Sequence, residues 1–158
     1  MLDIKQVLKE IGAKNGLEMC LDENGACTLE LADGRVVVLQ ERADLNELDF
    51  VANLGTVPEE VRAEVFTALL SANFYWNETF GATLSWNADL EEAVLIYPLP
   101  LAEATPESVE TIFNRFVELQ SAWAERLSNL VAAAQEDEPV DDVGDDPASN
   151  DSDLIISP

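Results

Sequence analysis

Carboxylates are the only side chains abundant enough in this sequence to suggest chemistry. The chain of 158 residues holds 32 Asp and Glu residues and no histidine, so the usual general base and favoured metal ligand is missing. Three acidic pairs could in principle share a proton or hold a hard cation: Asp44 with Glu47, Glu59 with Glu60, and Glu91 with Glu92. Each pair adjoins a predicted turn or helix start, where a solvated or dipole-complementing acid is the better explanation.

The other potential site residues form no catalytic pattern. Cys20, Cys27 and the serines have no base near them in the sequence, and a lone nucleophile is no evidence of catalysis. The Asp-rich C-terminal stretch lacks the DxDxDG spacing of a calcium loop, and no GxxxxGK phosphate-binding loop occurs. We therefore expect a protein that is not an enzyme, with no catalytic residues, no metal site and no cofactor.

The chain is strongly acidic. Its formal net charge is -24, and residues 135–158 contribute nine acids and no Lys or Arg, which leaves about -15 for residues 1–134. Phosphates find no basic patch here, so binding to nucleic acid or to an anionic membrane is not expected. No stretch approaches eighteen uninterrupted apolar residues, and the sequence starts without a long apolar run. We therefore expect a cytoplasmic protein.

Hydrophobic periodicity predicts the order helix, three strands, helix, two strands, helix. The helices are predicted near residues 2–15, 58–76 and 106–134, and the strands near 27–31, 36–41, 47–54, 83–87 and 93–99. This order is typical of an α+β fold, a five-stranded antiparallel twisted sheet with three helices gathered on one face. Residues 1–134 are predicted to form one domain. Residues 135–158 are predicted to be a disordered acidic tail, because they have too little apolar area to offset the entropy of ordering.

Aromatic residues gather between the second predicted helix and the fourth predicted strand. Phe74, Tyr75, Trp76, Phe80 and Trp86 place five of the eleven aromatic residues within thirteen positions. This apolar area is more than one small chain obviously needs. The excess predicts burial against a second copy of the chain.

Four stretches together resemble the class I type III secretion chaperones, the family of small acidic bacterial proteins that includes the Tir chaperone. They are LDENGACTLEL, LLSANFYWNETFGATLSW, VLIYPLPL and FNRFVELQSAWAERL, within a likeness that covers about residues 2–130. The resemblance implies a bacterial homodimer that binds the N-terminal segment of one or more secreted effectors in extended form and keeps them soluble and competent for export. Such binding couples folding to association, through apolar grooves and added strand pairing. The secretion ATPase is a further partner that the resemblance implies.

The resemblance also suggests two surfaces. The dimer contact would use the second helix and the last two strands, through Leu70, Phe74, Trp76, Leu84, Trp86, Leu95 and Tyr97. The effector groove would use the first helix and the first three strands, through Ile4, Val7, Leu8, Ile11, Leu29, Val37, Leu39 and Phe50. For both sets the competing interpretation is ordinary monomer core.

Two other functions stay open. The chain could be a regulatory chaperone that sequesters an anti-activator of secretion genes with the same fold. Its charge alone also fits an acidic nucleic-acid mimic or immunity protein, which would bind a basic enzyme in a salt-sensitive way. The tail could be only a solubility device, or the apolar triplet Leu154–Ile156 that follows the nine acids could fold back onto a groove or dock on a partner.

Overall fold

The structure is a computed structural model, and it describes residues 1–137. Helices and strands follow the predicted order. Their bounds are α1 Ile4–Asn15, β1 Ala26–Glu30, β2 Val36–Arg42, β3 Glu47–Thr56, the short 3₁₀ helix η1 Glu59–Val61, α2 Arg62–Ala72, the 3₁₀ helix η2 Phe74–Trp76, β4 Thr83–Asn87, β5 Glu92–Pro100 and α3 Pro106–Glu136.

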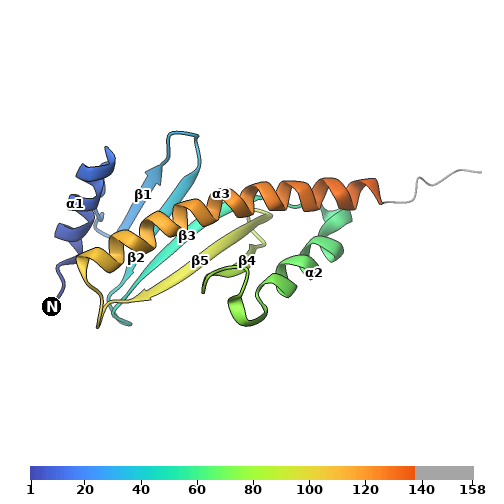
Figure 1. The fold of residues 1–158 in the computed structure, drawn as a ribbon. Helices are drawn as coiled ribbons and strands as arrows, with labels where there is room; N and C mark the ends of the chain where they lie inside the picture. Colours follow the sequence, from blue (N-terminus) through green and yellow to red (C-terminus); the bar gives the residue numbers. More distant parts are fainter. Residues whose placement is uncertain (138–158) are drawn as a thin grey trace, which may run out of the picture.

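The five strands form one antiparallel sheet in the order β1-β2-β3-β5-β4 (Figure 1). The first three strands pair in sequence order as an antiparallel meander. β5 then returns beside β3, and β4 pairs only with β5, so β1 and β4 are the two edges of the sheet. The predicted α+β class, with a five-stranded antiparallel sheet and three α-helices, is therefore confirmed.

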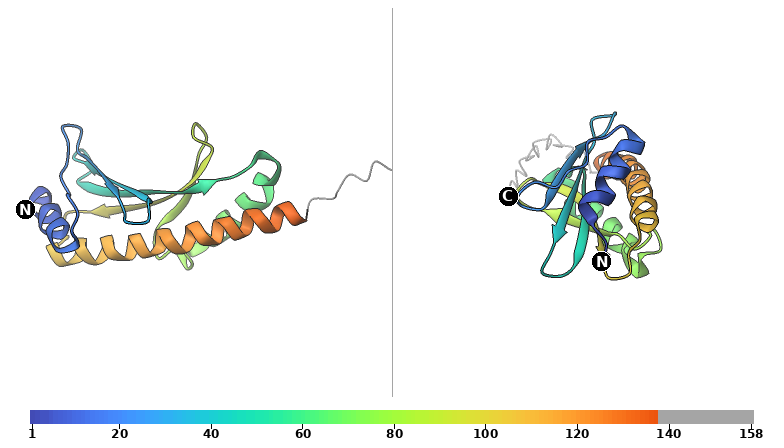
Figure 2. Two further views of the ribbon diagram at one scale, coloured as in Figure 1. Left: turned by 90° about the horizontal axis from the view of Figure 1, so that it is seen from above. Right: turned by 90° about the vertical axis from the view of Figure 1, so that its left-hand side faces the viewer.

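The helices lie on one face of the sheet, and α3 runs along its length (Figure 2). α1 lies at the β1 end and α2 at the β4 end, and both contact α3. On the opposite face no helix of the described residues covers the strands. A Thr105–Ser108 capping box and Pro106 in the first turn fix where α3 begins.

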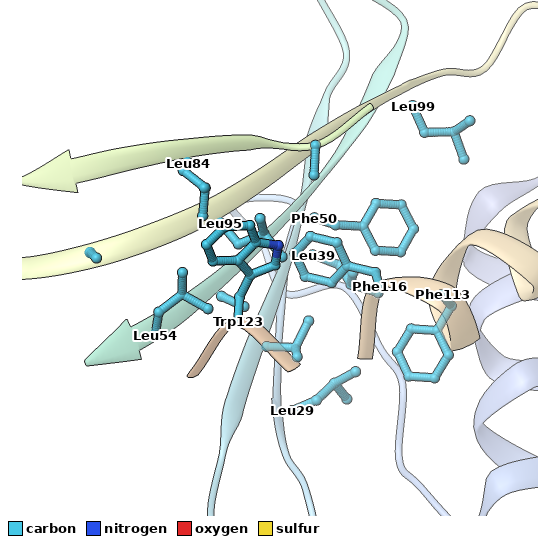
Figure 3. Packing of buried hydrophobic residues seen from close by; sticks show 14 of the residues in the cluster. Leu29, Leu39, Phe50, Leu54, Leu84, Leu95, Leu99, Phe113, Phe116 and Trp123 are labelled. Atoms are coloured by element: carbon cyan, nitrogen blue, oxygen red, sulfur yellow. The ribbon is translucent and has the colours of Figure 1, made fainter. Parts of the chain in front are cut away.

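The core fills the space between α3 and the sheet (Figure 3). Phe116 packs 5.6 Å from the ring of Phe50 on β3, and both rings are buried. Trp123, two turns later on α3, is also buried and donates its indole N–H to the Glu78 carbonyl at 3.2 Å. The burial of these large rings fixes both the height and the direction of α3 over the strands.

A fully buried glutamine joins α3 to the end of the β2–β3 ladder. The Gln120 amide nitrogen donates to the carbonyls of Val36 and Asn53, each at 3.1 Å. The backbone pairing of β2 with β3 stops at Val37 and Ala52, and the pairing of β3 with β5 shifts register after Asn53. Gln120 therefore supplies a donor to two backbone carbonyls where the strands separate.

The second predicted helix, 58–76, is interrupted in the structure. Thr56 belongs to β3, Pro58 precedes η1 without a side-chain capping bond, and α2 begins only at Arg62. α2 ends at Ala72 because Asn73 bonds to β4 and because Tyr75 and Trp76 take left-handed backbone angles, each with φ 52°. Such angles are rare for residues other than glycine and end a right-handed helix.

The last helix continues to Glu136, two residues past the predicted domain boundary at residue 134. The predicted disordered tail otherwise concerns residues 138–158, which lie outside the described residues. No helix of residues 1–137 is both long and apolar enough to cross a membrane.

Replacing Gln120 tests its part in joining α3 to the sheet. We expect Gln120→Ala to lower the free energy of unfolding by about 2–4 kcal/mol, because two backbone carbonyls lose their donor and the removed, fully buried side chain leaves a cavity. Gln120→Glu should destabilise more at neutral than at acidic pH, because burial beside two carbonyls favours the protonated acid. Urea unfolding at one protein concentration measures both, with the exposed Ser121→Ala as control. Unfolding free energies equal to that control would contradict this role.

Candidate functional site

All eight residues predicted to line an effector groove lie in the core of the chain. Each is at most 5% exposed, and Val37, Leu39 and Phe50 are fully buried. They pack beneath α3 or between α1 and the sheet, so in this structure they offer no surface to another protein. The prediction that these residues line a groove is therefore wrong. Side chains alternate along each strand, so the apolar face that the prediction chose is the one covered by the helices, and the residues between them point outward. The set is Ile4, Val7, Leu8, Ile11, Leu29, Val37, Leu39 and Phe50.

The opposite face of the sheet presents those neighbours. Thr28, Val38, Val51, Ile96 and Thr83 lie opposite one another across all five strands. Thr28 is exposed and the other four are half-buried. This row of β-branched side chains, and not the predicted groove residues, forms the accessible surface of the sheet.

The β1 edge of the sheet is open for strand pairing along part of its length. Gly25 bonds to Glu41, and Leu31 bonds to Arg35, at the two ends of the β1–β2 ladder. By the alternation of an antiparallel pair, the backbone groups of Ala26, Thr28 and Glu30 point away from β2. Asp22 takes both outward groups of Ala26, through its side chain and its backbone N–H. Among the described residues, no hydrogen-bond partner is found for the outward groups of Thr28 and Glu30.

The β4 edge is closed by a side chain instead. The Asn73 amide nitrogen donates to the Leu84 carbonyl at 3.0 Å, and the Leu84 N–H donates to the Asn73 oxygen at 2.9 Å. The amide thus makes the pair of bonds that another strand would make. An added strand would have to displace Asn73 from β4, whereas at β1 the outward groups of Thr28 and Glu30 can accept a strand directly.

Only part of the predicted dimer surface is exposed. Leu70, Phe74 and Trp76 are 68%, 71% and 53% exposed, and they lie in α2 and η2. With Tyr75, whose ring contacts Phe74 at 4.6 Å, they form a surface that we call the apolar ridge. Large exposed apolar groups of this kind are typical of protein interaction sites.

The other four predicted dimer residues pack within the chain. Leu84 and Leu95 are buried in the core. The half-buried Trp86 packs 4.8 Å from Phe66 and lies beneath the Arg62 guanidinium, whereas the half-buried Tyr97 contacts Phe50 edge to face. Their contacts with their own chain leave Leu70, Phe74 and Trp76 as the members of the predicted set that are free to meet a partner.

Titratable groups form no reactive centre in the described part of the chain. No group of three or more Cys, Asp or Glu residues that could hold a metal ion occurs within residues 1–137. Burial raises the pKa of the Cys27 thiol, which keeps it protonated and unreactive near neutral pH. Cys20 is exposed, and both cysteines are free thiols.

The family of the chain follows from comparison with known proteins. The model of the Tir chaperone protein (CesT) family matches residues 6–124, which include most of α1, the whole sheet, α2 and much of α3. This chain belongs to the CesT family. That family is one of secretion chaperones and is not known for enzymes. No curated protein matches this CesT-family chain in sequence.

Several solved structures share the fold of this CesT-family chain. In the crystal structure of the ExsC–ExsE complex, the matched chain is 22% identical with a TM-score of 0.69, and the match covers 78% of this chain and 92% of that one. For the HopA1–SchA chaperone–effector complex the values are 12%, 0.62, 77% and 93%. For the ExoU–SpcU complex of the Pseudomonas aeruginosa type III secretion system they are 21%, 0.61, 82% and 98%. At these identities the comparison shows a common fold.

The different burial of the two cysteines predicts different reactivity. In the folded protein near pH 8, we expect iodoacetamide to modify Cys20 and to leave Cys27 unmodified, because the Cys27 thiol is buried and remains protonated. Mass spectrometry should count one modified thiol per chain, two after unfolding, and none for folded Cys20→Ser. Modification of Cys27 at the rate of Cys20 would show that the α1 end of the sheet opens in solution.

Proposed function

We propose that this protein is a cytoplasmic type III secretion chaperone, without enzyme activity, that binds the N-terminal segment of one or more effectors in extended form. Membership of the CesT family is the observation that carries the proposal. One structure with the same fold is that of a chaperone–effector complex, and another comes from a type III secretion system. The bound effector stays soluble and competent for export, and the secretion ATPase separates it from the chaperone.

The β1 edge and the outward sheet face together suit an extended client. An added strand would pair with the free backbone groups of Thr28 and Glu30, which gives affinity that does not depend on client sequence. Alternate client side chains would reach the outer face near Val36 and Val38, where Val36 is 40% exposed. The closed β4 edge supports β1 as the side on which the client begins.

The apolar ridge supports a homodimer. Three of its four side chains are aromatic and consecutive in the sequence, and all four are exposed by half or more, which is the composition of the centre of a protein interface. A two-fold axis through the ridge would bring the same residues of two copies together. The client would then meet one open β1 edge on each subunit.

Capture of the natural partner tests the proposed function. We expect the protein, purified from its own bacterium, to carry a large secreted protein whose N-terminal segment binds tightly and with little dependence on salt. If the partner is a small cytoplasmic inhibitor of transcription activation, the protein is a regulatory chaperone. If it is a basic enzyme whose binding weakens steeply with salt, the protein is an acidic mimic. Mass spectrometry followed by titration calorimetry separates these outcomes.

A proline on the β1 edge tests strand addition. Thr28→Pro removes the outward N–H, and an edge position that faces solvent tolerates proline. We expect it to weaken binding of the captured effector segment about tenfold, because a hydrogen bond is lost and the ring obstructs pairing. Thr28→Ala keeps the N–H and should bind nearly as the unchanged protein does. Equal affinities for the proline and alanine variants would show that the client does not pair with β1.

Polar substitutions on the apolar ridge test the dimer. We expect Phe74→Ser combined with Trp76→Ser to weaken dimerisation at least about 100-fold, since each fully buried aromatic side chain contributes about 1.5–3 kcal/mol. Analytical ultracentrifugation over a range of concentrations measures the change. Leu45→Ser, which replaces an exposed leucine in the β2–β3 turn, is the control. If the unchanged protein is a monomer at every concentration, the ridge has another role.

A further inference from the structure

A second exposed apolar site lies between α3 and the segment that precedes β4. We call it the Phe80 groove, a surface hollow whose lining includes Phe80, Tyr97, Ile112, Arg115, Phe116 and Leu119. Phe80 is 65% exposed and its backbone is left-handed, with φ 51°. The next residue, Gly81, has φ 90°, and a side chain there would lie 3.3 Å from the Tyr97 ring. The groove has no lining residue in common with the apolar ridge.

Arg115 gives this groove a charge of defined sign. Its guanidinium carbon lies 5.8 Å from the centre of the Phe80 ring. The other four arginines, Arg35, Arg42, Arg62 and Arg126, each lie within 4.0 Å of a carboxylate. Arg115 has no such partner among residues 1–137, although the chain is strongly acidic. The groove therefore offers an apolar hollow beside an unpaired guanidinium, which suits an apolar side chain adjacent to a carboxylate.

The end of the chain has this chemistry. Asp153 directly precedes Leu154, Ile155 and Ile156, the only three consecutive aliphatic residues after Glu136. A bidentate pair between Arg115 and Asp153 would place the next side chains over the apolar lining. The segment thus matches both parts of the groove with adjacent residues.

The segment can also reach the groove. Asp137, which caps α3, lies twenty-two positions after Arg115, and at a rise of 1.5 Å per residue this distance is about 33 Å. Sixteen residues lead from Asp137 to Asp153, and their full extension is about 53 Å. The distance back along α3 is therefore shorter than the extended length of the segment, so Asp153 can reach Arg115 without a change in the structure of residues 1–137.

Tethering decides whether such a weak contact forms. The acidic body repels an acidic peptide, so the same sequence added as a free peptide should bind poorly. A linker of this length holds its end at an effective concentration of about millimolar. A contact of about millimolar affinity is then formed about half of the time within one chain.

We propose that residues 153–156 dock in the Phe80 groove of their own chain through an Asp153–Arg115 ion pair and burial of the aliphatic triplet. The contact shields exposed Phe80 in the free protein. Any client segment that needs this groove must displace the tail, so the docked segment weakens such binding by competition. The contact itself exists whatever client the protein serves, so its failure and the failure of the proposed chaperone function are separate results.

Paramagnetic labelling of the full chain tests the proposal. A nitroxide is attached at Ser157→Cys in a Cys20→Ser background, in which the remaining Cys27 is buried. We expect amide signals of residues 78–82 and 112–119 to lose about half of their intensity or more, since docking is populated about half of the time. Arg115→Glu should restore these signals, and the matched charge change Lys9→Glu should not. Replacing Leu154, Ile155 and Ile156 by Ser should also restore them, whereas Val140→Ser with Val143→Ser should not.

Three results would overturn the proposal. One is an absence of broadening near Phe80 in the unchanged background, and another is broadening that survives both Arg115→Glu and the triple serine substitution. The third is broadening that appears only between labelled and isotope-enriched copies in a mixed sample, which would place the segment on a second chain. The folded state of every variant is confirmed from the unperturbed signals of α1 and β2.

Discussion

The packing of α3 against the sheet determines where every other element of this protein lies. Phe116 and Trp123 are buried on the strands, and Gln120 between them binds two carbonyls where β2 and β3 separate. Apolar burial supplies the attraction, whereas the amide admits one rotation and one position of the helix. α1 and α2 both contact α3, so the fixed helix also sets the two ends of the molecule. The helices of the described residues all lie on one face of the sheet. The other face and the two edges of the sheet are therefore not covered by a helix.

The two edge strands of the sheet differ in how many of their outward backbone groups are hydrogen-bonded. Asn73 occupies the Leu84 backbone groups on β4, and Asp22 occupies only the first of the outward positions on β1. An open edge is usually an aggregation hazard. Here the free stretch is short, and the exposed Glu30 adds a charge to it. A partner that brings its own complementary strand is therefore favoured over chance pairing between edges.

The sequence predicted the order of the elements, because each strand alternates and each helix shows a 3.6-residue period. It did not separate core from surface within the apolar residues. Leu84 and Leu95 were assigned to a dimer contact and Val37 and Leu39 to a groove, yet all four are buried in the monomer. Periodicity identifies the apolar face of an element, but only the tertiary packing determines whether that face meets its own chain or another.

The remaining misses have one physical cause, which is a polar side chain whose partner is distant in the sequence. Gln120 interrupts the apolar stripe of α3 and looks like a surface residue until its partners on β2 and β3 are known. Asn73 ends α2 because it bonds to Leu84, eleven residues later. Phe80 was recognised as part of an aromatic cluster, but the groove beside it exists only where α3 passes. Such contacts depend on the completed fold and have no local signal.

The acidic charge and the exposed aromatic residues act over different distances. Between two copies of so acidic a chain the repulsion is long-ranged, but salt screens it beyond about 8 Å under physiological conditions. Apolar contact acts only where water is excluded, so it is decided by shape at a few residues such as Phe74 and Trp76. Charge therefore opposes unspecific association at a distance, and the proposed contact through the apolar ridge would form only where the two surfaces fit. This division explains how a chain can keep several large aromatic side chains in water and still be selective about what covers them.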